Sequence, residues 1–286
     1  MFDSKILAGK SILVTGGGSG LGLAMATAFA AHGAQVTIAG RKKERLEPAL
    51  PKILAAAREG GEAEAFTADV RDPEQVERLV DHAVSRFGKI DALVNNAAGN
   101  FLAFSEELTP NGFDAVVRTV LYGSVNCTLA VGRHLLARKA PGSILSIVAS
   151  YAWTGTPFAL SSACAKAGVL AMTRSLAVEW GHAGIRLNAI APGPIPTEGA
   201  FSRLMAGPAA QKIALSRIPS GRFGTKEEIA NLAIFLLSDL CPWQTGDCVT
   251  MDGGEWLAGA GEFSDYRKIP RDQFKAALDA MRPPKK

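Results

Sequence analysis

Short apolar runs alternate with longer amphipathic segments along most of this sequence. Most of the apolar runs are hydrophobic at successive positions, which is typical of strands in a parallel sheet covered by helices on both faces. The expected strands are 11–15, 35–39, 64–68, 90–95, 143–148, 185–190 and 248–252. The expected helices are 20–32, 42–58, 73–87, 111–138, 160–182 and 226–238. This alternation predicts a doubly wound α/β fold with right-handed crossovers.

Two stretches interrupt the alternation without dividing the chain. No linker, repeat or low-complexity segment is visible, so residues 1–286 are expected to form a single domain. We expect a substrate lid at about 196–222 and a C-terminal extension at about 255–286.

The composition argues against several classes of protein. Hydrophobic residues make up 48% of the chain and charged residues 20%, which is ordinary for a soluble globular protein. The formal net charge of +4 fits an anionic ligand, and the basic residues form no stripe of the kind that binds nucleic acid. The sequence contains no run of about 18 apolar residues, which is the length that would indicate a membrane span. We therefore expect no nucleic-acid partner and no membrane contact.

The cysteines and histidines are scattered and suggest no metal site. None of the cysteines has the C-x-x-C spacing, so they are expected to be reduced. The residues concerned are Cys127, Cys164, Cys241, Cys248, His32, His82, His134 and His182.

The N-terminal residues pass almost directly into the first expected strand, which leaves no room for a targeting segment. We expect a cytoplasmic protein.

A glycine-rich stretch, TGGGSGLG, follows the first expected strand directly. Gly16, Gly20 and Gly22 have the spacing G-x-x-x-G-x-G. Without β-carbons the turn can close tightly, and backbone N–H groups at the next helix can approach a pyrophosphate. A tight turn without a ligand is the alternative, but the position between a strand and an apolar helix favours a dinucleotide site. The expected contacts are Gly16, Gly17, Gly18, Ser19, Gly20, Leu21 and Gly22.

The residues after the second expected strand indicate which dinucleotide binds. An acidic residue here would hold the ribose 2′-hydroxyl of NADH, whereas a basic residue accommodates a 2′-phosphate. The strand is followed by Arg41, Lys42 and Lys43. These side chains would also suit a solvent-exposed helix start, but the planar guanidinium of Arg41 can grip a phosphate. We therefore expect NADPH in preference to NADH.

Four ordered motifs resemble those of the short-chain dehydrogenase/reductase family. They are the glycine loop, Asp69-Val70 after the third strand, NNAAG at 95–99 after the fourth, and PGPI at 192–195. The resemblance covers about residues 8–255. It implies a Rossmann fold whose seven parallel strands have the order 3-2-1-4-5-6-7.

The family resemblance also implies cofactor contacts and an assembly. Asp69 and Val70 would contact the adenine, and Lys166 would hold the nicotinamide ribose. The other implied cofactor contacts are Asn96, Pro192, Gly193, Pro194 and Ile195. Members of the family usually form homotetramers through two long helices, which correspond here to 111–138 and 160–182.

The usual proton relay of this family is incomplete in the present sequence. The acid tyrosine belongs four residues before Lys166, where Ser162 stands. The usual helix asparagine corresponds to Val120, and the usual serine falls at Ala149 or Ser150. A serine hydroxyl is far less acidic than a tyrosine, whose pKa is about 10, so Ser162 cannot replace the missing acid.

Another tyrosine follows the fifth expected strand. Tyr151 and Asn100 come after neighbouring strands, whose carboxyl ends share one edge of the sheet. The phenol and the amide can therefore converge on one carbonyl oxygen, with Lys166 on the following helix. The alternatives are an aromatic lid residue for Tyr151 and a turn residue for Asn100.

This rearranged set resembles the 2,4-dienoyl-CoA reductases within the family. The likeness extends through NNAAGNF at 95–101, residues 162–181, PGPIPTEGAFSRL at 192–204 and DGGEWL at 252–257. It implies the catalytic residues Tyr151 as proton donor, Asn100 as a second hydrogen bond to the thioester oxygen, and Ser162 with Lys166 at the ribose. The implied contacts to an acyl-CoA substrate are Arg71, Phe101, Thr109 and Arg203.

Two other functions remain open from the sequence. The first is a different reductase with the same cofactor site, acting on 2-enoyl-CoA or on a 3-oxoacyl thioester. The second is a non-catalytic dinucleotide-binding protein, which the serine at position 162 superficially suggests. Activity on conjugated dienes would separate the first from a dienoyl-CoA reductase, and NADPH oxidation of any kind would exclude the second.

Overall fold

A seven-stranded parallel sheet forms the centre of the protein. A computed structural model describes residues 3–198 and 207–281. The sheet has the strand order β3-β2-β1-β4-β5-β6-β7, which confirms the order expected from the sequence. The strands are β1 (Ser11–Thr15), β2 (Gln35–Gly40), β3 (Glu62–Thr67), β4 (Ala92–Asn95), β5 (Gly142–Ile147), β6 (Ile185–Pro192) and β7 (Cys248–Met251).

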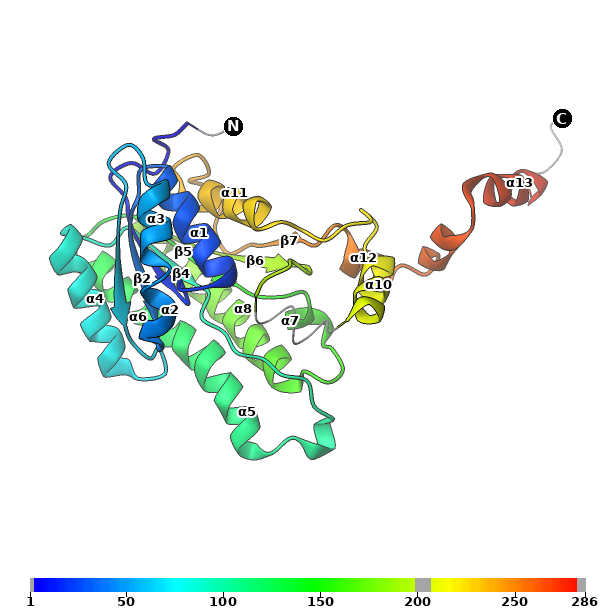
Figure 1. Cartoon of the computed structure of the whole chain (residues 1–286), viewed down its shortest axis with the longest axis horizontal. Coiled ribbons are helices and arrows are strands. Elements are labelled where there is room, and N and C mark those ends of the chain that lie inside the picture. Colours follow the sequence, from blue (N-terminus) through cyan, green and yellow to red (C-terminus); the bar gives the residue numbers. More distant parts are fainter. Residues whose placement is uncertain (1–2, 199–206, 282–286) are drawn as a thin grey trace.

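Helices cover both faces of the sheet (Figure 1). The first eight are α1 (Gly20–Ala31), α2 (Lys43–Leu46), α3 (Leu50–Ala56), α4 (Pro73–Phe87), α5 (Pro110–Val117), α6 (Gly123–Ala137), α7 (Tyr151–Thr154) and α8 (Leu160–Trp180). The others are α10 (Pro208–Arg217), α11 (Lys226–Leu237), α12 (Glu255–Ala260) and α13 (Arg271–Met281). On one face α1 packs with α3 and α11, and on the other α6 packs with α4 and α8.

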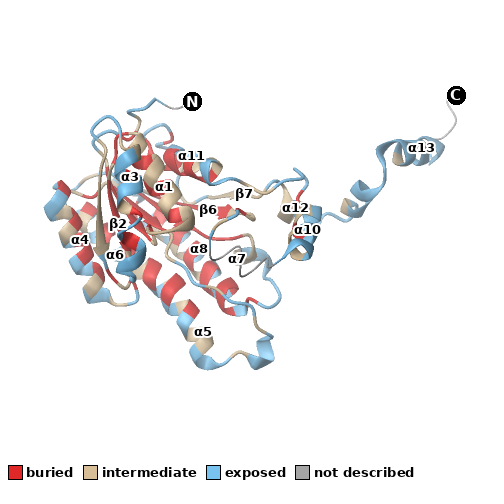
Figure 2. Ribbon diagram, in the orientation of Figure 1, coloured by how far each residue is buried: buried red, intermediate tan, exposed pale blue. Residues whose placement is uncertain are grey.

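The alternation of side chains along β1 explains why its residues are apolar at successive positions. Ile12 and Val14 belong to the core cluster beneath α1 and α11, whereas Leu13 belongs to the cluster beneath α4 and α6. Successive side chains of a strand point to opposite faces, and both faces are covered here. Figure 2 shows the resulting buried residues in the layer between the helices.

Two expected helices are interrupted. The expected helix 42–58 divides into α2 and α3, because Pro48 lies between them and a proline cannot donate the backbone hydrogen bond of a helix interior. The expected helix 111–138 contains a π-helical turn, Arg118–Tyr122, between α5 and α6. The π turn brings Gly123 against Val70, where an added β-carbon would lie 2.5 Å from Val70 Cγ2.

The C-terminal extension is partly helical and leaves the body of the protein. It contains α12, the 3-10 turn Ser264–Lys268 and α13. The last helix projects away from the sheet and has no buried residue (Figures 1 and 2). Of the expected lid at 196–222, residues 199–206 lie outside the described residues, and α10 follows them.

One long helical stretch has the length and composition of a membrane span. Within the described residues this is Pro110–Ala137, with a mean hydropathy of 1.2. The fold buries 56% of its apolar window, as is common for a core helix, so the match is weak evidence for a span.

The hydroxyl of Thr15 connects the end of β1 to the end of β4. Its Oγ1 donates to Val94 O (3.2 Å) and accepts from the backbone N–H groups of Asn96 and Ala97, each at 3.0 Å. Thr15 is buried. These hydrogen bonds fix the start of the NNAAG segment beside the glycine loop.

We expect Thr15→Val to lower the free energy of unfolding by about 1–3 kcal/mol, because two backbone N–H groups lose their acceptor. Urea denaturation measures the change. The control is Thr173→Val, since that buried hydroxyl donates only to Val169 O within its own helix. Equal losses in the two variants would contradict a special role for Thr15.

Candidate active site

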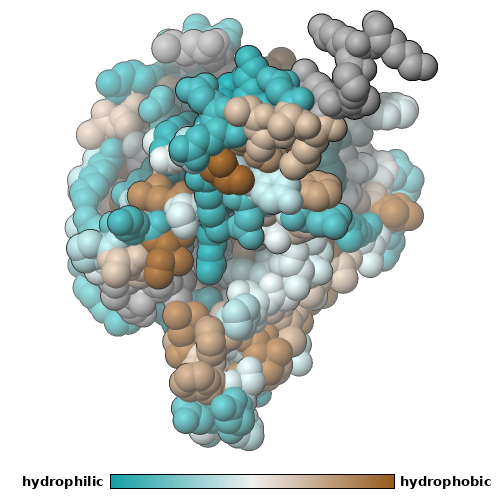
Figure 3. Space-filling view, turned by 90° about the vertical axis from the view of Figure 1, so that its right-hand side faces the viewer, coloured by the Kyte–Doolittle hydropathy of each residue, from teal (hydrophilic) through white to brown (hydrophobic). Residues whose placement is uncertain are grey.

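A large cavity of about 1900 Å³ lies at the edge of the sheet where the strands end. The segments after β1, β2, β4, β5 and β6 contribute to its wall, together with α8, α10 and α12. Ligands of doubly wound sheets bind at this edge. Figure 3 looks onto this end of the molecule, with hydrophilic side chains gathered in its upper half and an apolar protrusion below.

The glycine loop can accept a pyrophosphate at the start of α1. Gly16 and Gly20 have φ angles of +68° and +57°, which side chains other than glycine rarely adopt. A β-carbon on Gly22 would lie 2.4 Å from Gly16 O, so only glycine permits this approach of helix to strand. Ser19 makes no side-chain capping hydrogen bond, which leaves the first N–H groups of α1 to bind a ligand.

Most of the predicted loop residues face the cavity. Gly16, Gly18, Ser19, Gly20 and Leu21 line it. Gly17 and Gly22 do not, and instead allow the close packing of the loop on the core.

The end of β2 carries a basic cluster. The predicted Arg41 lines the cavity together with Lys42, Arg45 and Lys52. Arg45 and Lys52 were not predicted, although the density of basic residues after the second strand could have indicated them. The residue directly after β2 is the basic Arg41, and among the described residues Glu44 is the one acidic side chain that lines this part of the cavity. This end of the cavity therefore suits a phosphate.

The predicted adenine contacts separate in the structure. Val70 lines the cavity, and Asn126 Nδ2 holds its backbone by donating to Val70 O at 2.9 Å. Asp69 instead accepts two hydrogen bonds from Arg71 Nε, at 2.9 and 3.0 Å. Burial opposes ionisation of Asp69, but the hydrogen bonds from Arg71 outweigh it and lower the pKa of the carboxyl.

Asn96 and the PGPI segment border the cavity as predicted. Asn96 Nδ2 donates to Thr15 O (3.0 Å) and to Gly16 O (3.3 Å), so its side chain braces the glycine loop. Pro192, Gly193, Pro194 and Ile195 all line the cavity. A β-carbon on Gly193 would lie 2.8 Å from Asp252 Cα, which explains the glycine at this position.

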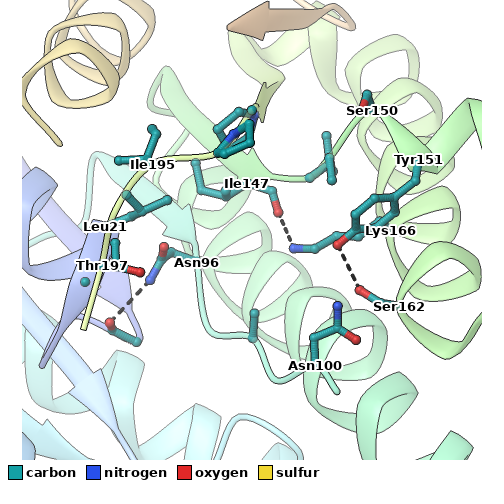
Figure 4. A pocket seen from close by; sticks show the side chains of 18 of the residues that line it. Leu21, Asn96, Asn100, Ile147, Ser150, Tyr151, Ser162, Lys166, Ile195 and Thr197 are labelled. Atoms are coloured by element: carbon teal, nitrogen blue, oxygen red, sulfur yellow. Dashed lines mark hydrogen bonds between the residues drawn. The ribbon is translucent and has the colours of Figure 1, made fainter. Parts of the chain in front are cut away.

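Tyr151, Ser162, Lys166 and Asn100 meet in the middle of this cavity (Figure 4). Tyr151 follows the fifth strand, as expected from the sequence. The strand β5 ends at Ile147, and Tyr151 begins the four-residue helix α7. This turn directs the phenol toward the start of α8.

The phenol of Tyr151 has a hydroxyl partner. Tyr151 Oη and Ser162 Oγ share a hydrogen bond of 3.1 Å, so Ser162 contacts the proposed acid directly. Burial raises the pKa of Tyr151, and the hydrogen bond to Ser162 acts in the opposite direction. The phenol therefore carries its proton at neutral pH, as a proton donor must.

Lys166 is buried beside this pair. Its Nζ donates to Ile147 O at the end of β5 (Figure 4). Burial lowers the pKa of Lys166 to about 8. The amine is therefore close to losing its charge under mildly alkaline conditions, and a ligand that accepts hydrogen bonds would favour the charged form.

Asn100 faces the same space from the end of β4. Its Oδ1 accepts a hydrogen bond from the backbone of Phe101 at 2.9 Å, which fixes the orientation of the amide. Among the described residues its Nδ2 has no hydrogen-bond partner, and Figure 4 shows this nitrogen directed toward the side of Ser162 and Lys166. The site thus offers an amide donor and a phenol donor across one gap.

The predicted substrate contacts are mostly outside the cavity wall. Arg71 is bound to Asp69, and Thr109 caps α5 by accepting from Gly112 N at 3.1 Å. Phe101 is 40% exposed, and Arg203 lies outside the described residues. These four assignments remain predictions. Trp256, which lies within the DGGEWL stretch, also lines the cavity, although no role was predicted for it.

The described residues contain no group of three or more His, Cys, Asp or Glu side chains that could hold a metal ion. Cys127, Cys164, Cys241 and Cys248 are all free thiols. Burial raises the pKa of Cys127 to about 12, so this thiol is not a nucleophile. The side chains that meet in the middle of the cavity carry hydroxyl, amine and amide groups.

A family model described as "Enoyl-(Acyl carrier protein) reductase" matches residues 16–255. The chain belongs to the short-chain dehydrogenase/reductase family. It is an oxidoreductase with a nicotinamide dinucleotide cofactor, and the glycine cradle and the open N–H groups of α1 fit such a cofactor.

Similar proteins include several described as 2,4-dienoyl-CoA reductases. One from Bacillus subtilis, described as producing (2E)-enoyl-CoA, is 47% identical over 87% of this chain and 97% of its own length. One from Caenorhabditis elegans, described as producing (3E)-enoyl-CoA, is 46% identical over 87% of this chain and 81% of its own length.

Solved structures of the family superpose closely on this chain. A short chain dehydrogenase from Bacillus anthracis has a TM-score of 0.79 at 44% identity, covering 87% of this chain and 97% of that chain. A protein from Agrobacterium tumefaciens, described as a 2-deoxy-d-gluconate 3-dehydrogenase and solved with bound NADP, has a TM-score of 0.80 at 35% identity. The match covers 88% of this chain and 99% of that chain.

We predict that kcat/KM for the nicotinamide cofactor falls as the pH rises above about 8, because the free enzyme then loses the positive charge of Lys166. Initial rates between pH 6 and about 10 measure this. Lys166→Arg keeps its charge over the whole range, so its residual activity should lack the alkaline limb. If the fall in kcat/KM at alkaline pH were unchanged in that variant, the titrating group would be a residue other than Lys166.

Proposed function

We propose that this chain is an NADPH-dependent 2,4-dienoyl-CoA reductase that yields a 3-enoyl-CoA during the β-oxidation of unsaturated fatty acids. The observation that carries this proposal is the position of the acid. Tyr151 approaches the centre of the cavity from α7, and Ser162 on α8 occupies the usual place of the tyrosine and bonds to it. Asn100, which lines the same cavity, supplies a second donor.

The relatives support the substrate class. Several proteins described as 2,4-dienoyl-CoA reductases match most of this chain, including those from Bacillus subtilis and Caenorhabditis elegans. Their descriptions differ in the position of the remaining double bond. Position 3 is proposed here because Tyr151 acts near the thioester end, where protonation of the α-carbon leaves the double bond between carbons 3 and 4.

The donor groups stabilise charge that develops on the thioester. When bound, the nicotinamide cofactor supplies a hydride to the far end of the conjugated diene. Asn100 Nδ2 and Tyr151 Oη donate hydrogen bonds to the thioester oxygen, where negative charge accumulates, in the manner of an oxyanion hole. Tyr151 then acts as the acid for the α-carbon, and Ser162 holds the phenol in position.

Lys166 completes the site. The amine holds the cofactor ribose, and its positive charge favours release of the phenolic proton during the reaction. Because Lys166 is buried, its charge acts in a medium of low dielectric and is screened little.

Several observations support NADPH as the cofactor. Arg41, Lys42, Arg45 and Lys52 line the end of the cavity beyond β2. A neighbour of known structure binds NADP. Guanidinium groups suit a 2′-phosphate, whereas a ribose 2′-hydroxyl would require an acceptor there.

A second candidate is a reductase of 2-enoyl or 3-oxoacyl thioesters. The family model that matches the chain carries the description of an enoyl reductase, which favours the enoyl thioester of these two. The displaced acid argues for the diene. Purified enzyme should therefore oxidise NADPH with 2,4-hexadienoyl-CoA and yield hex-3-enoyl-CoA, and faster turnover of crotonyl-CoA would favour this second candidate instead.

We also propose a cytoplasmic homotetramer. Exposed apolar side chains on α6 and α8, including Leu129, Leu136 and Val178, would be covered by neighbouring subunits. The free thiols are compatible with a reducing compartment. Light scattering gives the molar mass of the assembly.

We expect Tyr151→Phe to lower kcat with 2,4-hexadienoyl-CoA by about 10²–10⁴-fold, because the variant lacks the general acid. The dissociation constant for NADPH, measured by fluorescence titration, should stay unchanged. Tyr122→Phe is the matched control, since Tyr122 is exposed outside the cavity wall. Retention of full activity in Tyr151→Phe would exclude this tyrosine as the acid.

We expect Arg41→Ala to raise KM for NADPH by about 10–100-fold, because a charged hydrogen bond to the 2′-phosphate contributes about 1.5–3 kcal/mol. KM for NADH should change little. Lys43→Ala serves as the control, because Lys43 pairs with Glu47 and does not line the cavity. Equal changes for the two cofactors would contradict a phosphate contact at Arg41.

A further inference from the structure

The cavity is larger than one ligand requires. Pockets for single small molecules measure about 300–1000 Å³, whereas this cavity measures about 1900 Å³. The dinucleotide features occupy the part between the basic cluster after β2 and Lys166. Beyond Lys166 the cavity continues to α10, α12 and the turn Ser264–Lys268. Figure 1 shows that α10 and α12 lie at the opposite end of the molecule from α2 and α3.

The C-terminal extension helps to build the far end of the cavity. The family model ends at residue 255, and the Bacillus subtilis relative is matched over 97% of its own length while leaving the rest of this chain uncovered. Ser264, Asp265, Arg267 and Lys268 nevertheless line the cavity. The extension therefore adds side chains to the cavity beyond the residues that the family model matches.

An aromatic contact fixes the start of the extension against the acid-bearing helix. Trp256 on α12 and Trp153 on α7 pack edge to face, with ring centroids 5.7 Å apart. Tyr151 lies on the same short helix as Trp153. The extension is thus held next to the reacting end of the cavity.

Two guanidinium groups of this region are available to an anion. Among the described residues Arg217, at the end of α10, has no salt bridge, and Glu255 is the nearby acidic group that interacts with it. Within the described part of the chain, the one hydrogen bond of the Arg267 side chain runs from its Nε to Ser264 O at 3.2 Å, and Asp265 is the nearby acidic group that interacts with it. The charge of Lys268 is instead offset by Asp265, at 2.6 Å.

We propose that Arg217 and Arg267 form a phosphate clamp at the outer end of the cavity and bind a phosphate group of the CoA moiety. This inference rests on the proposed acyl-CoA substrate. A guanidinium group presents a planar fork of donors that matches phosphate oxygens. The basic cluster after β2 serves the cofactor phosphate at the other end, so the two phosphate-bearing ligands meet at Lys166 and Tyr151 with their phosphates apart.

The test compares two thioesters of the same 2,4-dienoyl group, one on CoA and one on pantetheine, which lacks the phosphates. We expect Arg217→Ala and Arg267→Ala each to raise KM for the CoA thioester about tenfold. KM for the pantetheine thioester and KM for NADPH should not change. Arg271→Ala, on the projecting helix α13 and outside the cavity wall, is the matched control and should change neither KM.

Each contrary outcome has a defined meaning. Equal losses with both thioesters, or with the control variant, would overturn the clamp. A rise in KM for NADPH alone would assign the arginines to the cofactor phosphate and would also overturn it. A wild-type enzyme that reduces neither thioester would refute the proposed function instead.

A binding measurement tests the clamp without catalysis. Adenosine 3′,5′-bisphosphate, the phosphate-bearing end of CoA, should bind the wild-type protein at saturating NADPH. Its affinity in calorimetry should fall about tenfold or more in the Arg217→Ala, Arg267→Ala double variant. Equal affinity in the wild type and the double variant would contradict the clamp.

Discussion

The pairing of β4 with β5 positions both hydrogen-bond donors of the site. The two strands are parallel, and Asn95 stands opposite Ser146. Asn100 and Tyr151 follow these paired residues at equal separations along the chain, and both line the cavity at this edge of the sheet. Because both faces of the sheet are buried, a shift in this register would expose apolar side chains, and the geometry of the donors is therefore fixed by the core.

Burial controls the protonation of two groups in the site. Tyr151 is held protonated by its burial, whereas burial brings the pKa of Lys166 to about 8. Groups whose environments push their pKa values in useful directions are typical of acid-base sites. Ser162 belongs to this arrangement as the partner of the phenol. The serine therefore accompanies a displaced acid, and its presence in place of tyrosine is no sign of a lost activity.

Much of the fold and the cofactor site could be predicted, because periodicity and glycine spacing report directly on buried strands and close backbone approaches. The lining role of Arg41 follows from the basic residues after the second strand, whereas the order of the sheet and the lining role of Asn96 follow from the resemblance to the family. Two further features have a signal in the sequence. Pro48 indicates the division of the second expected helix, and Thr109 before Pro110 indicates a helix cap. Other features depend on tertiary contacts that no local pattern encodes. They are the pairing of Arg71 with Asp69, the π turn, and the position of Arg267 in the cavity wall.

A crystal structure with NADP⁺ and an unreactive acyl-CoA tests the central claim most directly. Our account predicts that Tyr151 Oη and Asn100 Nδ2 both lie about 2.6–3.2 Å from the thioester oxygen, on opposite sides of it. The Tyr151–Ser162 hydrogen bond should persist in that complex. A thioester oxygen bound to Ser162 or to Lys166, with the phenol turned away from the substrate, would contradict the account.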